Sequence, residues 1–389
     1  MDVFVLDSQL RRIQVFDVYE SFIWAERFIP DGDFKLVISN KANNLSYLTE
    51  GAWLVINDSE RVMVIETVEE AQNAEGLGVL NISGRSIESI LKERIARFAL
   101  SNLEVEPRWV TTGKPVDVVK YVFRHICIDG SLDKRDILPF IKQGSIFPES
   151  TVPVPLDEYT IAMDPATLFD TLVDICQTFG LGFALVRNLD KSELYFEVYS
   201  GSDRTSAQKV LPSVIFSTEL DSLNNTTSLV SIQDYKNVAY VISPLGARTV
   251  YAEGYDSAAA GFKRRVLLVK IDSLEPEKGE EGLSIQELLQ RRGQSALNEH
   301  QRLSAFDGEI PSHGHKYNKD YRLGDIVEMR NAYGETKYMR VTEQIFSSDA
   351  EGDKSYPTLS LHKYITPDSW HGWNTIAEWS DVEETWDEM

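Results

Sequence analysis

Two stretches of this chain, far apart in the sequence, carry the same pattern of strand and turn residues. LTEGAWLVI…RVMVIETVEEAQNAEG, near residues 48–76, matches YRLGDIVEM…KYMRVTEQIFSSDAEG, near residues 321–352. Met63 aligns with Met339 at an offset of 276, whereas Gly51 and Gly324 differ by 273, so the second hairpin carries three more residues. Any two β-hairpins share some of this pattern, and two copies fall short of a solenoid. The alternative to chance is a chain that contains two similar β domains.

Residues 1–83 contain short apolar runs separated by turn residues. The runs are VFVL, FKLVI, WLVI, RVMVIETV and GVLNI, and the turns include PDGD, NDSE and NAEGLG. Strands at a spacing of about 8–12 residues are typical of a sandwich or a small barrel. The sequence therefore predicts a first β domain in residues 1–100, with a closing helix at its end.

That closing helix and a second one are predicted from apolar periodicity. In residues 85–100 the apolar side chains fall on one face, and basic residues lie toward the carboxyl end, where the helix dipole favours cations. A second apolar stripe runs from Pro115 to Ile128. Both segments are expected to be amphipathic helices.

A third helix is indicated by its end signals. Asp164 is a good N-cap, Pro165 suits the first turn, and Gly180 ends the helix. The hairpin GFALV…ELYFEVY follows it. Residues 101–209 are therefore predicted to form an inserted α+β domain.

The remainder of the chain returns to β structure. Strand-like runs in residues 210–308 are SVIFS, NVAYVIS, RTVYA and RRVLLVKI, and a helix begins at the capping box of Ser284 and Glu287, with an apolar stripe that extends to Leu303. Whether 210–308 divides between domains stays open. Residues 309–365 are expected to hold the second set of hairpins, so the chain as a whole is predicted to be α+β and mainly β.

The charge and the cysteines exclude several classes of protein. The chain of 389 residues has 61 acidic and 39 basic side chains, a formal net charge of −22. Such a surface repels DNA and anionic membranes. Cys127 and Cys176 are the only cysteines, which excludes a disulfide framework and a four-thiolate metal site. No signal peptide or membrane span is expected, so we predict a soluble protein made in a cytoplasm.

Few residues are candidates for chemistry. His313 and His315 form the one paired histidine motif, and alternate strand residues could direct both rings to one metal, but no third ligand lies at diagnostic spacing. Carboxylate pairs such as Asp17 with Glu20 are expected by chance among 61 acids. The sequence has no GxGxxG, P-loop, GxSxG or HExxH motif. We therefore predict no catalytic site, no metal site and no cofactor.

The segment 366–389 differs from the rest in composition. Within it, positions 370–389 have six acids and no lysine or arginine, and they contain four of the seven tryptophans: Trp370, Trp373, Trp379 and Trp386. These rings either pack on the body of the protein or anchor a partner, since tryptophan is enriched in interface hot spots. The four tryptophans are the candidate partner-binding residues.

A series of weakly specific motifs in a fixed order suggests a family. They are Leu6-Asp7, Tyr19–Trp24, Arg27, Gly32–Phe34, Leu48–Gly51, Gly84–Ser86, Leu91–Ile95, Tyr321–Val327, Met339–Val341 and Tyr356–Leu359. Their order over residues 1–365 resembles that in the hub-type minor tail proteins of long-tailed (siphovirus-type) bacteriophages, especially those that infect actinobacteria.

This resemblance implies a baseplate hub at the tail tip of a virion, similar to the hub of contractile tails. Each subunit would have two tube-type β-barrel domains with smaller α/β domains inserted, assembled as a homotrimer. Six similar barrels would match a six-fold tail tube, and acidic walls would repel the DNA that passes. The implied partners are the chain itself, distal tail and tail tube proteins, the tape measure protein, and other baseplate or receptor-binding proteins.

Two other functions stay open from the sequence. The first is a cell-wall hydrolase carried at the tail tip. The second is a receptor module that binds host saccharide, because Tyr251, Tyr255 and Trp109 could stack on sugars, although core packing explains these rings equally well.

Overall fold

The computed structural model divides into two compact units. The larger is built from Met1–Val154, Ile161–Thr227 and Phe306–His362, and the smaller from Pro155–Thr160 and Ser228–Ala305. The structure describes residues 1–361 except 30, 73–77, 99–108, 143, 157, 164, 189–192, 218, 221, 253, 256–257, 272–273, 275–283, 301–302, 312–313 and 331–335.

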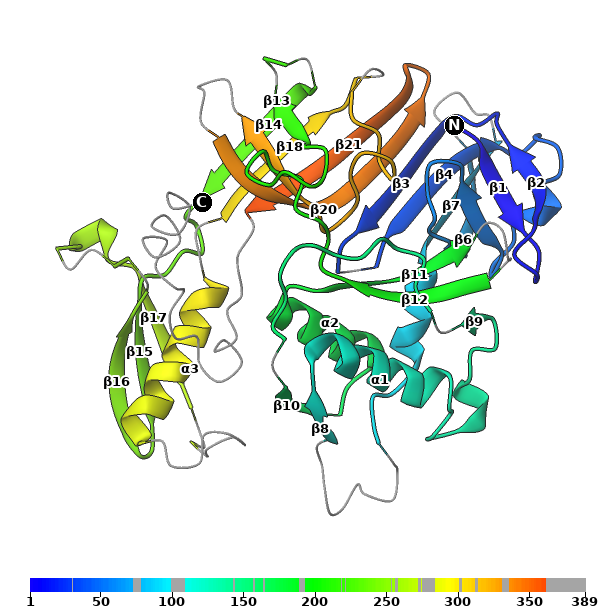
Figure 1. The fold of residues 1–389 in the computed structure, drawn as a ribbon. Coiled ribbons are helices and arrows are strands. Elements are labelled where there is room, and N and C mark those ends of the chain that lie inside the picture. Colours follow the sequence, from blue (N-terminus) through cyan, green and yellow to red (C-terminus); the bar gives the residue numbers. More distant parts are fainter. Residues whose placement is uncertain are drawn as a thin grey trace. The chain divides into compact units, whose positions relative to one another are not determined.

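The main element is a 13-stranded sheet, whose first strands are blue in Figure 1 and whose later strands run from green through yellow to orange. Its strands are β1 (Val3–Leu6), β2 (Arg12–Phe16), β3 (Ser21–Arg27), β4 (Asp33–Ser39), β5 (Trp53–Ile56), β6 (Met63–Gln72), β7 (Gly78–Ser86), β13 (Ile215–Ser217), β14 (Asn224–Ser231), β18 (Leu303–Glu309), β19 (Ile326–Arg330), β20 (Thr336–Asp349) and β21 (Gly352–Leu361). The order across the sheet is β14-β18-β21-β20-β3-β4-β7-β6-β5-β1-β2, and β19 pairs with both β20 and β13. The mainly-β fold class predicted from the sequence is confirmed.

The sheet contains the same five-stranded pattern twice. Across the sheet the first copy runs β3-β4-β7-β6-β5 and the second runs β14-β18-β21-β20-β19. The order along the chain is also the same, because each copy begins with its edge strand and ends with its longest hairpin. The strand that continues the sheet beyond each copy differs: β1 pairs with β5 antiparallel, whereas β13 pairs with β19 parallel. The internal repeat is therefore a repeat of topology as well as of sequence.

Backbone hydrogen bonds confirm the residue alignment. The N–H of Gly51 donates to the carbonyl of Ile65 at 2.7 Å, and the N–H of Gly324 donates to that of Val341 at 2.8 Å. Both glycines have positive φ, +80° and +90°, a conformation that favours glycine. The partner of Leu54 is Met63 and that of Val327 is Met339, so the three extra residues lie between Val327 and Met339.

An identical irregularity completes the match. The register of β6 against β7 shifts between Ile65 and Thr67, and that of β20 against β21 shifts between Val341 and Glu343. These two positions are related by the same sequence offset as the two methionines. A bulge inserts one residue and bends the strand, so the two long strands bend at the same point.

An α+β segment joins the two copies. Its elements are η2 (Ile87–Glu93), β8 (Trp109–Gly113), α1 (Pro115–Cys127), η4 (Lys134–Asp136), β9 (Ile141–Lys142), β10 (Tyr159–Met163), α2 (Leu168–Phe179), β11 (Gly182–Asn188) and β12 (Glu193–Tyr199). The predicted second helix and the β11–β12 hairpin are confirmed. Gly180, at φ +66°, ends α2 as predicted.

Two helix predictions in this segment are wrong in detail. Residues 85–100 do not form one helix: β7 continues through Ser86, and only the short 3₁₀ helix η2 follows. The N-cap of α2 is Thr167, whose side chain accepts the N–H of Asp170. Ser86 pairs with Met63 of β6, and Ile95 forms a β-bridge with Thr167, so both ends of the predicted 85–100 helix are held in extended pairing.

The smaller unit is a three-stranded sheet with one helix. Its strands are β15 (Val238–Ser243), β16 (Gly246–Tyr251) and β17 (Val266–Lys270), in the order β16-β15-β17, with η5 (Gly261–Lys263) before β17. The helix α3 (Ile285–Glu299) lies along one face of this sheet (Figure 1) and begins at the predicted capping box of Ser284 and Glu287. The predicted stripe extended too far, since Leu303 already starts β18.

Separate apolar cores stabilise these parts. One core lies around Phe22, Trp24 and Met63 of the first copy, and another contains Tyr321 and Met339 of the second copy together with Phe216 of β13. A third lies between α3 and its sheet. Within the described part of the chain, no helix combines the length and the apolar character needed to cross a membrane.

Candidate functional site

The feature that distinguishes this sheet is the joint between its two copies. β3, the edge strand of the first copy, pairs with β4 on one side and with β20 of the second copy on the other. The β20 ladder runs antiparallel from Glu343 opposite Arg27 to Ser348 opposite Phe22. An edge strand exposes unpaired N–H and C=O groups and is a template for another strand. In this chain the edge of one copy is used to extend the other.

Buried polar groups fix the register of the joint. Glu26 lies opposite Gln344, and both are almost fully buried. The carboxylate of Glu26 accepts hydrogen bonds from Nε1 of Trp24 and from the hydroxyl of Tyr317, each at 2.8 Å. Tyr321 donates to Oε1 of Gln344 at 2.6 Å. A one-residue slip would leave these buried groups without partners, which is costly.

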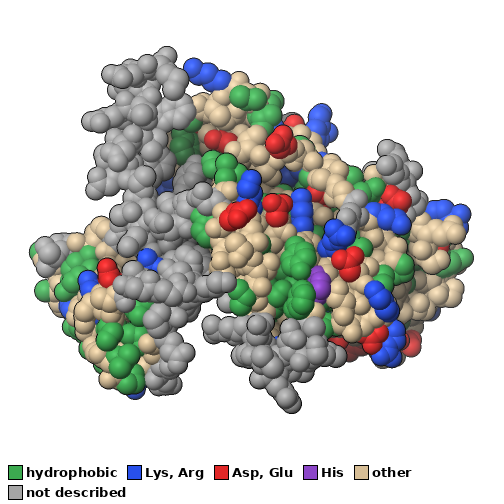
Figure 2. Space-filling model, turned by 60° about the horizontal axis from the view of Figure 1, so that its bottom comes forward, with side chains coloured by type: hydrophobic (Ala, Val, Ile, Leu, Met, Phe, Trp, Pro, Cys, Tyr) green, Lys and Arg blue, Asp and Glu red, His purple; other side chains and the backbone are tan. Residues whose placement is uncertain are grey.

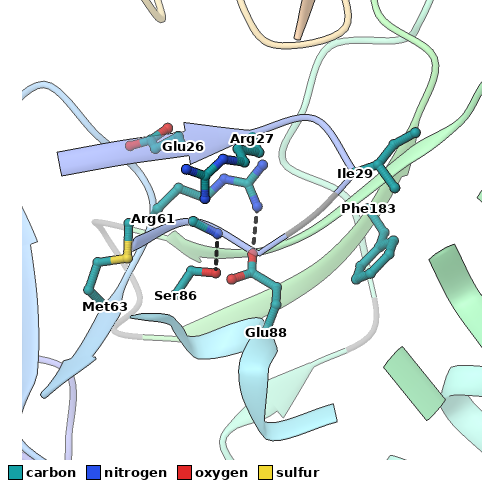
Figure 3. Close-up of a pocket in the computed structure, with 9 residues that line it drawn as sticks. Glu26, Arg27, Ile29, Arg61, Met63, Ser86, Glu88 and Phe183 are labelled. Atoms are coloured by element: carbon teal, nitrogen blue, oxygen red, sulfur yellow. Dashed lines mark hydrogen bonds and ion pairs between the residues drawn. The ribbon is translucent and has the colours of Figure 1, made fainter. Parts of the chain in front are cut away.

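A buried ion pair lies next to the joint (Figure 3). Arg61 and Glu88 are 2.5 Å apart, and Arg61 also donates to the hydroxyl of Tyr199 at 3.1 Å. Burial raises the pKa of Glu26. Burial alone would lower the pKa of Arg61, but the neighbouring Tyr199, Glu88 and Glu26 outweigh it and raise that pKa. The cavity around these side chains measures only about 10 Å³, so it has no room for a substrate. The cluster is a structural tie between the first copy and the α+β segment.

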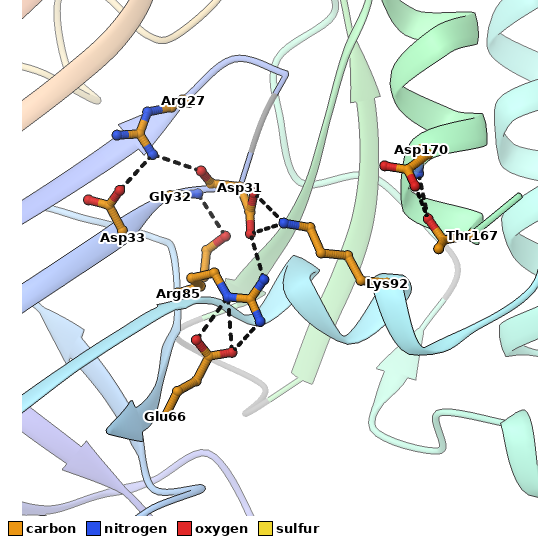
Figure 4. A network of polar contacts seen from close by, with 10 residues as sticks. Arg27, Asp31, Gly32, Asp33, Glu66, Arg85, Lys92, Thr167 and Asp170 are labelled. Atoms are coloured by element: carbon orange, nitrogen blue, oxygen red, sulfur yellow. Dashed lines mark hydrogen bonds and ion pairs between the residues drawn. The ribbon is translucent and has the colours of Figure 1, made fainter. Parts of the chain in front are cut away.

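Partly exposed charges brace the β3–β4 turn (Figure 4). Arg27 contacts Glu343 across the joint at 2.8 Å. It also contacts Asp33 in β4 at 2.9 Å. Asp31 in the turn pairs with Lys92 of η2 at 2.7 Å and with Arg85 at 3.7 Å. These contacts hold the strand that both copies share.

In the first copy, the strand edge that corresponds to the joint has no pairing partner among the described strands. By the alignment of the two methionines, the counterpart of Glu343–Ser348 is Thr67–Gln72 in β6. β6 pairs with β7 along its whole length, but with β5 only at Met63 and Val64. Among the strands that the structure describes, none pairs with the other edge of Thr67–Gln72. β14, the counterpart of β3, is also an end of the sheet.

The residues singled out for chemistry do not come together. Nε2 of His315 lies 3.3 Å from the carbonyl of Ile215, and its ring packs against Phe216, whereas His313 lies outside the described residues. No group of three or more potential metal ligands occurs in the part of the chain that the structure describes. Cys127 and Cys176 are buried, and burial raises the pKa of Cys127 to about 12 and that of Cys176 further above its usual range. Neither thiol is a nucleophile at neutral pH.

The aromatic residues predicted to bind sugar or a partner have different outcomes. Trp109 is buried against Phe98 and His125, so it is a core residue. Tyr251 and Tyr255 stack with their ring centroids 4.7 Å apart. The predicted partner-binding residues Trp370, Trp373, Trp379 and Trp386 lie outside the described residues.

Two further surface features were considered as functional sites: one open groove and the distribution of surface charge. The groove, of about 560 Å³, lies between Arg204, Ile215 and His315. On the face drawn in Figure 2, acidic and basic side chains are interspersed. That face has no single-sign field of the kind that a nucleic-acid binder presents.

The chain belongs to the family described as "Siphovirus ReqiPepy6 Gp37-like protein", whose model matches residues 2–359. It is therefore a phage tail protein of the siphovirus type, as the order of its motifs suggested. No curated protein matches the chain.

Solved structures agree on the fold. The tail protein from Neisseria meningitidis MC58 is 14% identical, with a TM-score of 0.57 over 94% of this chain and 98% of that one. The 43 kDa tail protein of prophage MuSo2 from Shewanella oneidensis is 12% identical, with a TM-score of 0.56 over 92% and 97%. The mainly-β architecture is therefore that of phage tail proteins.

Proposed function

We propose that this chain is the baseplate hub of a siphovirus-type tail, a ring of three subunits at the tail tip that continues the tail tube and lets DNA pass. The observation that carries the proposal is that the equivalent strand edges of the two copies are not both paired. Within one chain β3 fills the edge of β20, while, among the described strands, the matching edge of β6 and the strand that matches β3 are both left open.

Repetition of this joint supports a closed ring. If β14 of one subunit pairs with Thr67–Gln72 of the next, every copy of the repeat forms the same joint with its neighbour. Such a contact is heterologous, and it closes only when the rotation per copy divides a full turn. Two copies per chain and three chains give six similar positions, the number that a six-fold tail tube requires. An isologous dimer would not repeat the β3–β20 joint.

The charge supports passage of DNA. A formal net charge of −22 leaves the assembled ring strongly acidic, and acidic surfaces repel phosphates over about one Debye length. The neighbours we propose are the distal tail and tail tube proteins above the ring, the tape measure protein, and other baseplate or receptor-binding proteins. We propose no catalytic role, because the charged groups at the joint are used in structural contacts.

Disulfide scanning tests the ring. One cysteine replaces Glu69 in β6, and a second is moved through residues 224–231 of β14, one position at a time. Cys127 and Cys176 are buried and do not interfere. Oxidation should give covalent dimers and trimers, with no larger product, and cross-linking should recur at alternate positions because strand side chains alternate. A cysteine at Glu351, on the exposed β20–β21 turn, is the matched control and should give none.

Other outcomes separate the parts of the proposal. A ladder longer than three would show head-to-tail pairing without closure, and a dimer alone would contradict the ring. A native mass of three chains without cross-links would show that the ring uses other surfaces. Labelling of virions for this chain tests the location: signal at the distal end of the tail is expected, and signal along the tube would contradict a hub.

A further inference from the structure

The small sheet of β15, β16 and β17 has the sequence of a sheet that is covered on both sides. β15 reads VAYVIS and β17 reads VLLVK, so apolar side chains occupy consecutive positions. A strand that faces water on one side alternates apolar and polar residues, whereas continuous apolar runs are typical of strands buried on both faces. α3 covers one of the two faces, where Ala239, Val241 and Leu289 are fully buried.

The face opposite α3 is apolar and exposed. The ladders place Tyr240 opposite Leu268, and Val238 between Tyr251 and Val266. Val238 itself is buried, whereas the exposed fractions of the other large side chains there range from 38% for Val266 to 53% for Leu268. Exposed apolar patches of this kind mark interaction sites.

Among the described residues of this face, the charges have one sign. Arg264 donates to the hydroxyl of Tyr255 at 2.8 Å and to that of Tyr240 at 2.9 Å, which holds the guanidinium beside the aromatic rings. Lys270 lies beside Ile242 in the ladder. None of the described strand residues on this face is acidic. In a chain with a net charge of −22, a patch whose described charged residues are basic is complementary to an acidic apolar partner.

We propose that residues 366–389 of this chain are that partner, and that Trp370, Trp373, Trp379 and Trp386 pack on this face. Positions 370–389 provide four tryptophans and six acids without a single lysine or arginine. Indole rings would cover the apolar rows, and the guanidinium of Arg264 and the ammonium of Lys270 would meet the carboxylates and the ring faces. This proposal is independent of the ring, because every group that it uses belongs to the small sheet or to residues 366–389.

Oxidative labelling of the full-length protein, read by mass spectrometry, tests the contact. The four tryptophans should be labelled several-fold more slowly in the native protein than in urea. Leu268→Glu, which puts an acid on the face, should restore their labelling. Trp24 is fully buried and serves as an internal reference for the fold. Val18→Glu is the matched control, since Val18 is an exposed apolar residue of the larger unit, and it should leave the four tryptophans protected.

The reciprocal experiment keeps the proposal falsifiable if Leu268→Glu unfolds the small sheet. Replacing all four tryptophans by serine should increase the labelling of Tyr240 and Tyr251, while Tyr47, exposed to a similar extent elsewhere, should not change. Lys270→Glu should increase the labelling of the tryptophans, although it removes no apolar side chain from the face. Tryptophans that react equally in native protein and in urea would overturn the proposal. So would tyrosines that are protected only inside virions, because another tail protein would then cover the face.

Discussion

Glu26 in β3 lies directly opposite Gln344 in β20, and each residue is held by a tyrosine from the loop before β19. The two residues lie near opposite ends of the sequence, and they mark the point where the two copies of the repeat become one sheet. Their burial makes the joint specific, because a buried polar group without its partner costs more free energy than the hydrogen bond contributes.

Removal of one hydrogen-bond donor should therefore weaken the joint. Tyr317→Phe deletes the hydroxyl that donates to Oε2 of Glu26 and so removes one of the hydrogen bonds of this buried carboxylate. We expect the free energy of unfolding to fall by about 1–3 kcal/mol, as measured by urea denaturation. Tyr338→Phe, on an exposed tyrosine of β20, is the control. Equal stability of both variants would show that the joint does not depend on this bond.

A second prediction concerns the stability effect of a side chain at Gly201, whose backbone packs directly against the backbone of Gly324. A β-carbon at Gly201 would lie 2.1 Å from the carbonyl oxygen of Gly324, and Gly201 also has φ +88°. Gly201→Ala should destabilise the protein by about 3 kcal/mol or more, since neither backbone can yield. Gly51→Ala has a similar φ, +80°, but open space around it, and should cost only about 1–2 kcal/mol. Thermal unfolding of the two variants compares them, and equal losses would rule out the steric explanation.

Local signals predicted the elements that depend on neighbours in sequence. The capping box of Ser284 and Glu287, the terminator Gly180, and the alignment of Met63 with Met339 are all visible in the chain itself. They were correct because caps, turns and strand periodicity act over a few residues.

Elements that depend on partners distant in the sequence could not be predicted from local patterns. β14 reads NNTTSLVS and shows no apolar alternation; it becomes a strand because β18 pairs with it. The predicted N-cap Asp164 lies outside the described residues, and the N-cap is Thr167, which also forms a bridge with the distant Ile95. The joint itself has no local signature either, since β3 reads as an ordinary strand and nothing in it indicates that its second edge meets β20.

Breaking the buried ion pair gives a further test. Arg61→Met leaves the carboxylate of Glu88, which is 3% exposed, without its cation. Loss of one partner of a buried pair costs about 3–5 kcal/mol, so the midpoint of urea denaturation should fall markedly. Arg135→Ala breaks a solvent-exposed pair with Asp133 and should leave the midpoint unchanged. A midpoint for Arg61→Met close to that of the control would show that Glu88 finds compensation, for example from the N–H of Leu185, which already donates to it.

The pH dependence of stability should report Asp325, the residue after Gly324. Its oxygens accept the N–H of Ser202 at 2.7 Å and that of Arg322 at 3.0 Å, which ties the α+β segment to the second copy. Burial nevertheless raises the pKa of Asp325 to about 6, from 3.8. Because the folded pKa is the higher one, the protonated folded state is favoured: this contribution to stability is fully present below about pH 4 and is lost as the pH rises through 6. A shift of this size corresponds to about 3 kcal/mol of unfolding free energy.

Asp325→Asn cannot titrate, so the difference in unfolding free energy between the native protein and this variant should be largest near pH 4 and should shrink by about that amount at pH 7. Urea denaturation at both pH values measures it, and a difference that is constant with pH would show that Asp325 is already ionised in the folded protein at pH 4.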